Sequence, residues 1–144
     1  MASDTERAEY LGRRRARVLP ALAVLLITQQ VSFFARGGGE RLVDHVKIGA
    51  WVLLSAALLA MLATGGGWLR SRGVRALLND ESTRAHRDRA CVTGFWAAML
   101  CGVSIYVLAQ LTPVTGGEAV HLIVTAGLAA ALLSFARQER RALG

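Results

Sequence analysis

Charge is what long parts of this sequence lack. Only 19% of the 144 residues are Asp, Glu, Lys or Arg, against about 25% in an average soluble domain. Apolar residues make up 53%, and this content excludes a disordered chain. Two cysteines are too few for a disulfide scaffold. The length predicts a single domain over residues 1–144.

Charged residues are nearly absent from four stretches, 18–34, 46–64, 90–111 and 119–136. Each is 17 to 22 residues long, and about 20 helical residues span the ~30 Å of bilayer hydrocarbon. The one charged residue inside them is Lys47, one residue from an end, where its long stem can reach the headgroups. The sequence therefore predicts an all-α, integral membrane four-helix bundle that forms a single transmembrane domain. An ordinary soluble enzyme is excluded.

The first stretch could also be a cleaved signal peptide, because a basic segment, Arg13–Arg17, precedes it. Its length of 17 residues exceeds the usual 7–15 of the apolar region of such a peptide. Phe33–Arg36 also lacks the small residues of a cleavage site. We expect a retained helix.

Basic residues lie mainly on one side of the predicted spans. Fourteen of the 17 are in the N-terminal tail, the loop 65–89 and the C-terminal tail, whereas Arg36, Arg41 and Lys47 lie on the other side. The positive-inside rule then places both termini in the cytosol. The arginines stand beside the spans without interleaved aromatic residues. We therefore expect them to contact anionic lipid headgroups and expect no nucleic acid partner.

The cytosolic loop 65–89 divides into two parts. After Gly65–Gly67, apolar residues alternate with arginines, which predicts a short amphipathic helix at the membrane interface. Asn79 or Asp80 is a suitable N-cap for the third spanning helix, so we expect this helix to begin near Glu81. Charge pairing from Asp80 or Glu81 to Arg84 would support its first turn.

The same region resembles a family motif. The matching residues are Leu78, Asn79, Asp80, Glu81, Thr83, Arg84, Gly94, Phe95 and Trp96. The pattern, Leu-Asn-Asp-Glu-x-Thr-Arg before a Gly-aromatic-Trp span start, resembles small uncharacterised bacterial four-helix inner-membrane proteins. It covers under a fifth of the chain. The resemblance implies the bacterial cytoplasmic membrane and brings no known activity.

Two groups of residues are candidates for partner contact. They are the cytosolic residues Asn79, Asp80, Glu81, Arg84 and Arg87, and the small-residue row Gly94, Ala98 and Gly102. The first group would dock a cytosolic or membrane protein, or would simply cap and charge-pair a helix start. The second group allows close helix approach, either in a homo-oligomer or within one bundle.

Polar residues near the outer ends of the spans are candidates for a cofactor site. They are Gln29, Gln30, Gln110, His45 and His121. Glu118 and His121 at i,i+3 share a helix face and could hold a metal, and His45 with His121 could flank a haem iron. A quinone site is a further possibility. The alternative is ordinary interhelical hydrogen bonding, with no cofactor.

Transport and catalysis have weaker sequence support. The spans hold no Asp or Glu, whereas proton-coupled transporters use a buried acid. The segment Arg84–Asp88 is similar to one in membrane-bound glutathione-using enzymes, but Asp88, Arg89 and Cys91 replace its expected Asn, Asp and Glu. Cys91 and Cys101 lie about 15 Å apart along a helix, beyond disulfide reach. The predicted function is a non-catalytic interaction or regulatory subunit; a haem-, metal- or quinone-binding protein is the alternative.

Overall fold

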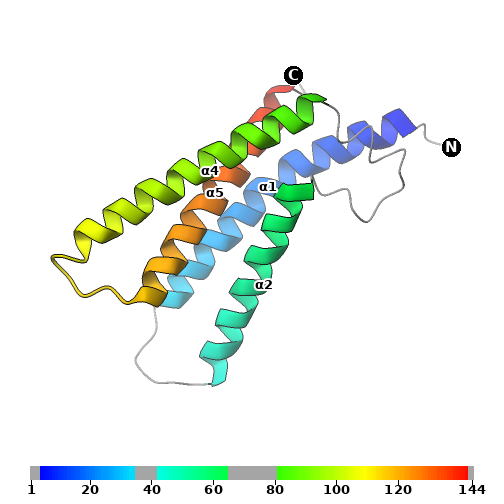
Figure 1. Cartoon of the computed structure of the whole chain (residues 1–144). Helices are drawn as coiled ribbons and strands as arrows, with labels where there is room; N and C mark the ends of the chain where they lie inside the picture. Colours follow the sequence, from blue (N-terminus) through cyan, green and yellow to red (C-terminus); the bar gives the residue numbers. More distant parts are fainter. Residues whose placement is uncertain (1–3, 35–41, 65–80, 143–144) are drawn as a thin grey trace.

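Four helices make up the part of the chain that the computed structural model describes, residues 4–34, 42–64 and 81–142. They are α1 (Asp4–Phe34), α2 (Leu42–Thr64), α4 (Glu81–Leu108) and α5 (Gly116–Ala142) (Figure 1). The all-α prediction is confirmed for these residues. The third predicted spanning helix begins at Glu81, as expected. The predicted interfacial helix and the caps Asn79 and Asp80 lie outside the described residues.

Three of the four predicted spans meet the requirements of a membrane-crossing helix. Helices α2, α4 and α5 each contain at least 18 residues of sufficient mean hydropathy. The apolar part of α1 that the structure describes, Arg17–Val31, is shorter. Toward its end it carries Gln29 and Gln30, which lower the hydropathy of this helix.

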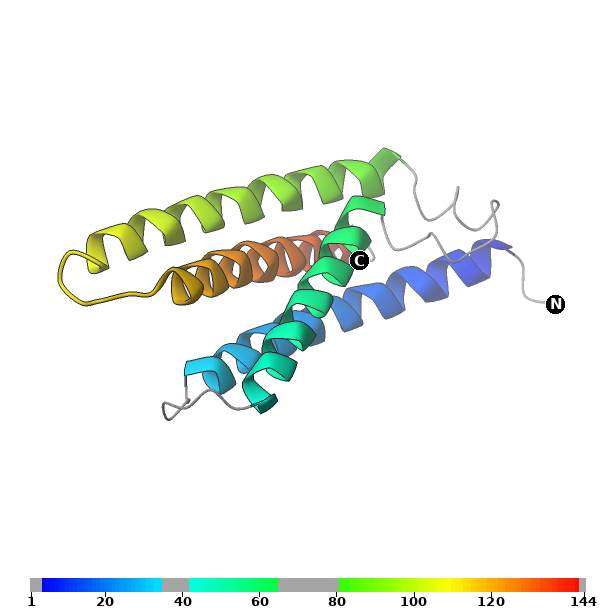
Figure 2. The same cartoon turned by 60° about the horizontal axis from the view of Figure 1, so that its bottom comes forward.

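Helix α5 is the centre of the structure. It lies between α4 and α1 (Figure 2). Its buried residues recur at the three- and four-residue spacing of one broad helix face: His121, Thr125, Leu128, Ala129, Ala131, Leu132, Phe135, Ala136 and Glu139. On α1, the buried residues Leu19, Ala23 and Leu26 follow the same spacing and join the core around Leu132.

Helix α2 packs along one edge. It buries Trp51, Ser55, Leu58 and Leu62, again one face of a helix. Its contacts with α5 and α1 are much less extensive than those that α5 makes with α4 and α1. The four helices are therefore an α1–α5–α4 layer with α2 lightly attached.

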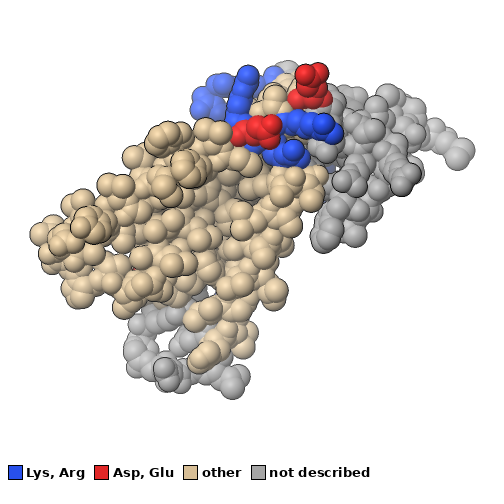
Figure 3. Space-filling model, in the orientation of Figure 1, with Lys and Arg blue, Asp and Glu red and all other residues tan. Residues whose placement is uncertain are grey.

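The large apolar side chains that face outward are numerous. On α4 they include Val92, Phe95, Trp96, Leu100, Val103 and Tyr106. Such a surface is unfavourable in water, where contiguous exposed apolar patches are normally small, but suits lipid. On the face drawn in Figure 3, the charged side chains gather at one end of the molecule, near the start of α4 and the end of α5, whereas Lys47 and Glu118 lie near the starts of α2 and α5.

Candidate functional site

The N-terminus of α5 is held by a reciprocal cap. The Glu118 carboxylate accepts hydrogen bonds from the Thr115 backbone N–H (2.8 Å) and hydroxyl (2.9 Å). The Thr115 hydroxyl oxygen in turn accepts from the Glu118 N–H at 3.3 Å. This is a capping box, Thr-x-x-Glu, which was visible in the sequence and was missed. Glu118 therefore stabilises the helix start.

His121 lies one turn further along α5, where its ring is buried between two aromatic rings. The Phe33 ring stacks on it at a centroid distance of 3.8 Å and an angle of 20°. Trp51 stacks at 3.8 Å and 25°. The three rings belong to α1, α2 and α5, so this stack joins three helices at one level. His121 was predicted as a site residue from the sequence, whereas neither aromatic partner was.

Thr125, one helical turn after His121 on α5, accepts the hydrogen bonds that link this helix to α1 and α2. Its hydroxyl oxygen accepts hydrogen bonds from the side-chain amide of Gln30 (2.5 Å) and from the indole N–H of Trp51 (3.4 Å). All three side chains are buried. Gln30 was among the predicted polar residues, whereas Thr125 was missed. Its position one turn after His121, on the same helix face, was the available sequence indication.

A small cavity adjoins the stack. It measures about 180 Å³ and is lined by Gln29, Phe33, Val46, Lys47, Ala50, Trp51 and His121. The Gln29 side-chain oxygen is buried without a hydrogen-bond partner. His45 is exposed and does not line this cavity. Gln110 is also exposed, beyond the end of α4.

The geometry around His121 limits what it can bind. Both faces of the ring are covered, and the cavity is smaller than the ~300 Å³ at the lower end of typical ligand pockets. Glu118, the predicted second ligand, is engaged in the cap. Among the residues that the structure describes, no three His, Cys, Asp or Glu side chains come together as a metal site. What this arrangement can do is hold three helices in register.

The small-residue row of α4 faces α5 within the same chain. A Cβ atom on Gly94 would lie 2.7 Å from the Gly127 carbonyl oxygen and 2.8 Å from the Ala131 Cβ. A Cβ on Gly127 would lie 3.1 Å from that of Ala98, and one on Gly102 would meet Ile123 at 3.6 Å. The row thus permits the close approach of α4 and α5, which is the packing alternative that the sequence left open.

An apolar groove lies between α2 and α4, with α5 as its floor. It measures about 410 Å³. Its walls are Leu59, Leu62 and Ala63 of α2 and Cys91, Gly94, Phe95 and Ala98 of α4, over Ile123, Val124, Gly127, Leu128 and Ala131 of α5. The sequence did not predict this groove, because it depends on the light packing of α2.

Cys91 and Cys101 are free thiols, as their spacing predicted.

Polar contacts also link α4 and α5 at the charged end. The His86 Nδ1 atom lies 3.4 Å from the buried Glu139 carboxylate. The Gln138 amide donates to the His86 carbonyl oxygen at 3.2 Å. Of the predicted docking residues at this end, Glu81 and Arg84 are exposed and Arg87 is half-buried. His86 and Glu139 were not selected from the sequence, because they are 53 positions apart.

The structure defines an all-helical protein with three helices that are long and apolar enough to cross a membrane. Comparison with protein-family models, with curated proteins and with solved structures finds no match to this chain.

Proposed function

We propose that this protein is a small bacterial inner-membrane protein of four spans that acts as a non-catalytic interaction or regulatory subunit. The groove between α2 and α4 is the observation that carries the proposal. We assign to it a transmembrane helix of a different membrane protein.

Helix α1 supplies the fourth span. Residues 18–34 of this helix are helical throughout and carry no charge, and these 17 residues rise about 26 Å, at the lower end of the length that spans the hydrocarbon. Helix α1 also packs along α5, a helix that is itself apolar enough to cross. An even number of spans would place both termini on one side, and the arginines near the α4 start and the α5 end support the cytosol as that side.

The groove suits a helix for two reasons. Among the described residues, its lining is apolar throughout and carries no charged side chain, and on the α2 wall the small side chain of Ala63 is exposed, which lets another helix approach closely there. In addition, α2 makes few contacts with the rest of the chain. A helix in the groove would contact α2 and α4 at once and complete the packing of α2.

Photocrosslinking from the groove tests this proposal. A benzoylphenylalanine at position 95 faces the groove. The matched control is position 96, since Trp96 is adjacent, aromatic and similarly exposed (60% against 58%), but does not line the groove. We expect a protein adduct from position 95 in native membranes, with the crosslinked peptide inside a transmembrane segment of one defined protein.

Filling the groove should abolish that adduct. Ala63 is exposed and lines the groove, whereas Ala57 is exposed on α2 and does not. Ala63→Trp is therefore expected to remove the adduct, and Ala57→Trp to retain it. Adducts with lipid alone, or equal adducts from positions 95 and 96, contradict the proposal. An adduct with a second copy replaces the subunit assignment with a homo-oligomer.

The topology has its own test. A reporter that is active only in the cytosol should be active when fused at Gly144 and inactive when inserted at Gly38. Activity at Gly38 would overturn the four-span, cytosolic-termini arrangement.

A cofactor-binding function at His121 has less support, because the cavity is small and the ring faces are covered. An absorption spectrum and metal analysis of the purified protein test it. A Soret band or bound metal that is lost in His121→Ala would replace the interaction proposal with a cofactor site.

A further inference from the structure

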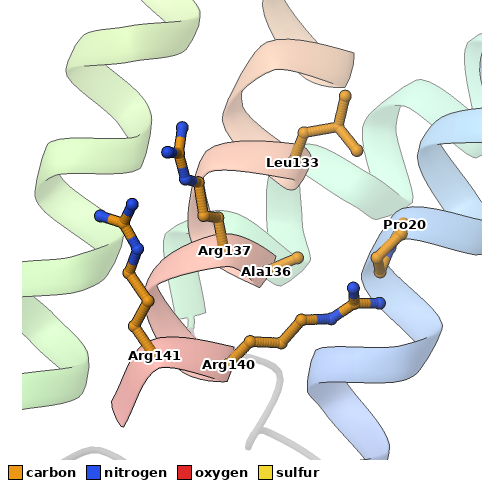
Figure 4. Close-up of a pocket in the computed structure, with 6 residues that line it drawn as sticks. All are labelled: Pro20, Leu133, Ala136, Arg137, Arg140 and Arg141. Atoms are coloured by element: carbon orange, nitrogen blue, oxygen red, sulfur yellow. The ribbon is translucent and has the colours of Figure 1, made fainter.

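The cytosolic end of α5 carries three arginines on one helix face. Arg137, Arg140 and Arg141 are exposed, and their i, i+3, i+4 spacing makes them neighbours on the helix surface. Together with Pro20, Leu133 and Ala136 they line an open pocket of about 460 Å³ between α5 and α1. In Figure 4 the Arg140 side chain extends from α5 toward Pro20 on α1, whereas the Arg137 and Arg141 side chains extend toward α4.

The pocket has one apolar part and one charged part. Leu133, Ala136 and Pro20 form the apolar part, and the arginines follow it along α5 toward the chain end. This order matches the change from acyl chains to headgroups at the inner leaflet, because α5 leaves its apolar segment at this point. The acyl chain of a lipid bound here would lie at the depth of the apolar part, and its headgroup would lie at the depth of the arginines.

The charge of the pocket favours an anion. Among the described residues that line it there are three arginines and no Asp or Glu, and Glu139, the acid between the arginines in sequence, is buried with its carboxylate 3.4 Å from His86 on α4. A guanidinium group presents paired N–H donors that match phosphate oxygens. The pocket therefore combines phosphate-binding groups with an acyl-chain surface.

We propose that this pocket binds one anionic phospholipid, with its phosphate on Arg140 and on the exposed side chains of Arg137 and Arg141 once these turn toward α1, and an acyl chain along Leu133 and Pro20. The proposal rests on the membrane placement proposed above. It commits to a lipid over a free phosphate because half of the lining is apolar.

Lipid titration of the full chain in neutral detergent, followed by native mass spectrometry, tests the site. Phosphatidylglycerol and phosphatidylcholine with identical acyl chains are the probes. We expect the protein to bind one phosphatidylglycerol molecule in preference to phosphatidylcholine. In the R137Q/R140Q/R141Q variant the affinity for phosphatidylglycerol should fall at least about tenfold, because each arginine contributes to the attraction of anionic lipid near a membrane surface. The control R84Q/R87Q/R89Q removes the same charge from the same end on α4 and should change affinity by less than about threefold.

Four results would overturn the proposal. They are equal affinity for the two lipids, equal losses in the two triple variants, binding of glycerophosphoglycerol without acyl chains as tightly as the lipid, and unchanged binding in Leu133→Trp. This last variant narrows the apolar wall at a residue that is already 44% exposed, so it should fold and weaken lipid binding with the charge intact. The position-95 crosslink and the Gly38 reporter report on a different groove and on topology, so failure of either proposal is distinguishable.

Discussion

At the scale of single residues, three glycines on α4 and α5 differ in the room available for a side chain. The space around Gly94 is closed by the backbone and a Cβ of α5, whereas a Cβ on Gly102 would meet only the flexible end of Ile123 at 3.6 Å. Gly127 is intermediate, with the Ala98 Cβ at 3.1 Å. The small-residue row is therefore not uniform, and its members can be ranked.

Alanine substitutions should follow that ranking. Gly94→Ala forces α4 and α5 apart and should cost about 1–3 kcal/mol, as overpacking does elsewhere. Gly127→Ala should cost less, and Gly102→Ala should be neutral or slightly stabilising because alanine favours helix. Resistance to unfolding in detergent is the measurement. Equal effects at positions 94 and 102 would contradict the observed α4–α5 approach.

The capping box at Thr115 and Glu118 gives a second residue-scale prediction. Glu118→Ala removes both acceptor contacts and should destabilise the start of α5 by about 0.5–2 kcal/mol. Glu118→Gln should retain most of the stability, because glutamine also completes a capping box. Thermal unfolding of both variants is the measurement. Equal losses would show that charge, and not the cap, is the source of the stabilisation.

At the scale of helices, α5 makes a polar side-chain contact with each of the other three described helices. Thr125 receives hydrogen bonds from α1 and α2, and Glu139 lies beside His86 of α4. Replacing Thr125 with the isosteric valine leaves the Gln30 amide and the Trp51 indole without their acceptor. A buried polar group that loses its hydrogen-bond partner costs about 1–3 kcal/mol of stability, while interhelical hydrogen bonds in membranes contribute about 0.6 kcal/mol on average.

We therefore expect Thr125→Val to destabilise the protein by about 0.6–2 kcal/mol and to change the fluorescence of Trp51. The matched control is Thr28→Val, since the exposed Thr28 hydroxyl donates to the Val24 carbonyl of its own helix at 2.9 Å. The control should stay within about 0.5 kcal/mol of the parent. If Thr125→Val changes neither the stability nor the fluorescence, the Thr125 hydroxyl does not contribute to helix packing.

The helices themselves were predictable, but their neighbours were not. Hydropathy predicted the three helices that are long and apolar enough to cross a membrane, and the polar segment before Glu81 predicted where α4 begins. In a membrane, however, outward and inward faces are both apolar, so the pattern does not say which helix packs on which. This is why the Gly94 row had two interpretations, and why Trp51 and Thr125 were not connected with His121.

At the scale of the whole molecule, the packing is uneven. Helix α5 is enclosed by α1 and α4, while α2 is attached along one edge. Regions with few packed contacts open locally at lower free energy. The structure therefore contains one element whose dynamics should differ from those of the rest.

Hydrogen exchange in detergent should show that difference. We expect the α2 amides to exchange faster than those of α5, and Thr125→Val to increase the difference by weakening the link from Trp51. If a partner helix occupies the groove, its addition should slow exchange in α2. Equal protection of α2 and α5 in the isolated protein would contradict the light attachment of α2.

The central position of α5 also has a consequence for how the chain assembles. Helix α5 follows the other three in sequence, and domains generally form as the chain is synthesised from its N-terminus. Among the described helices, α1 and α2 touch only slightly and α4 packs mainly on α5. The packing of these helices must therefore wait for α5, and a chain whose synthesis stops just before Gly116 would leave α1, α2 and α4 without the helix on which they assemble.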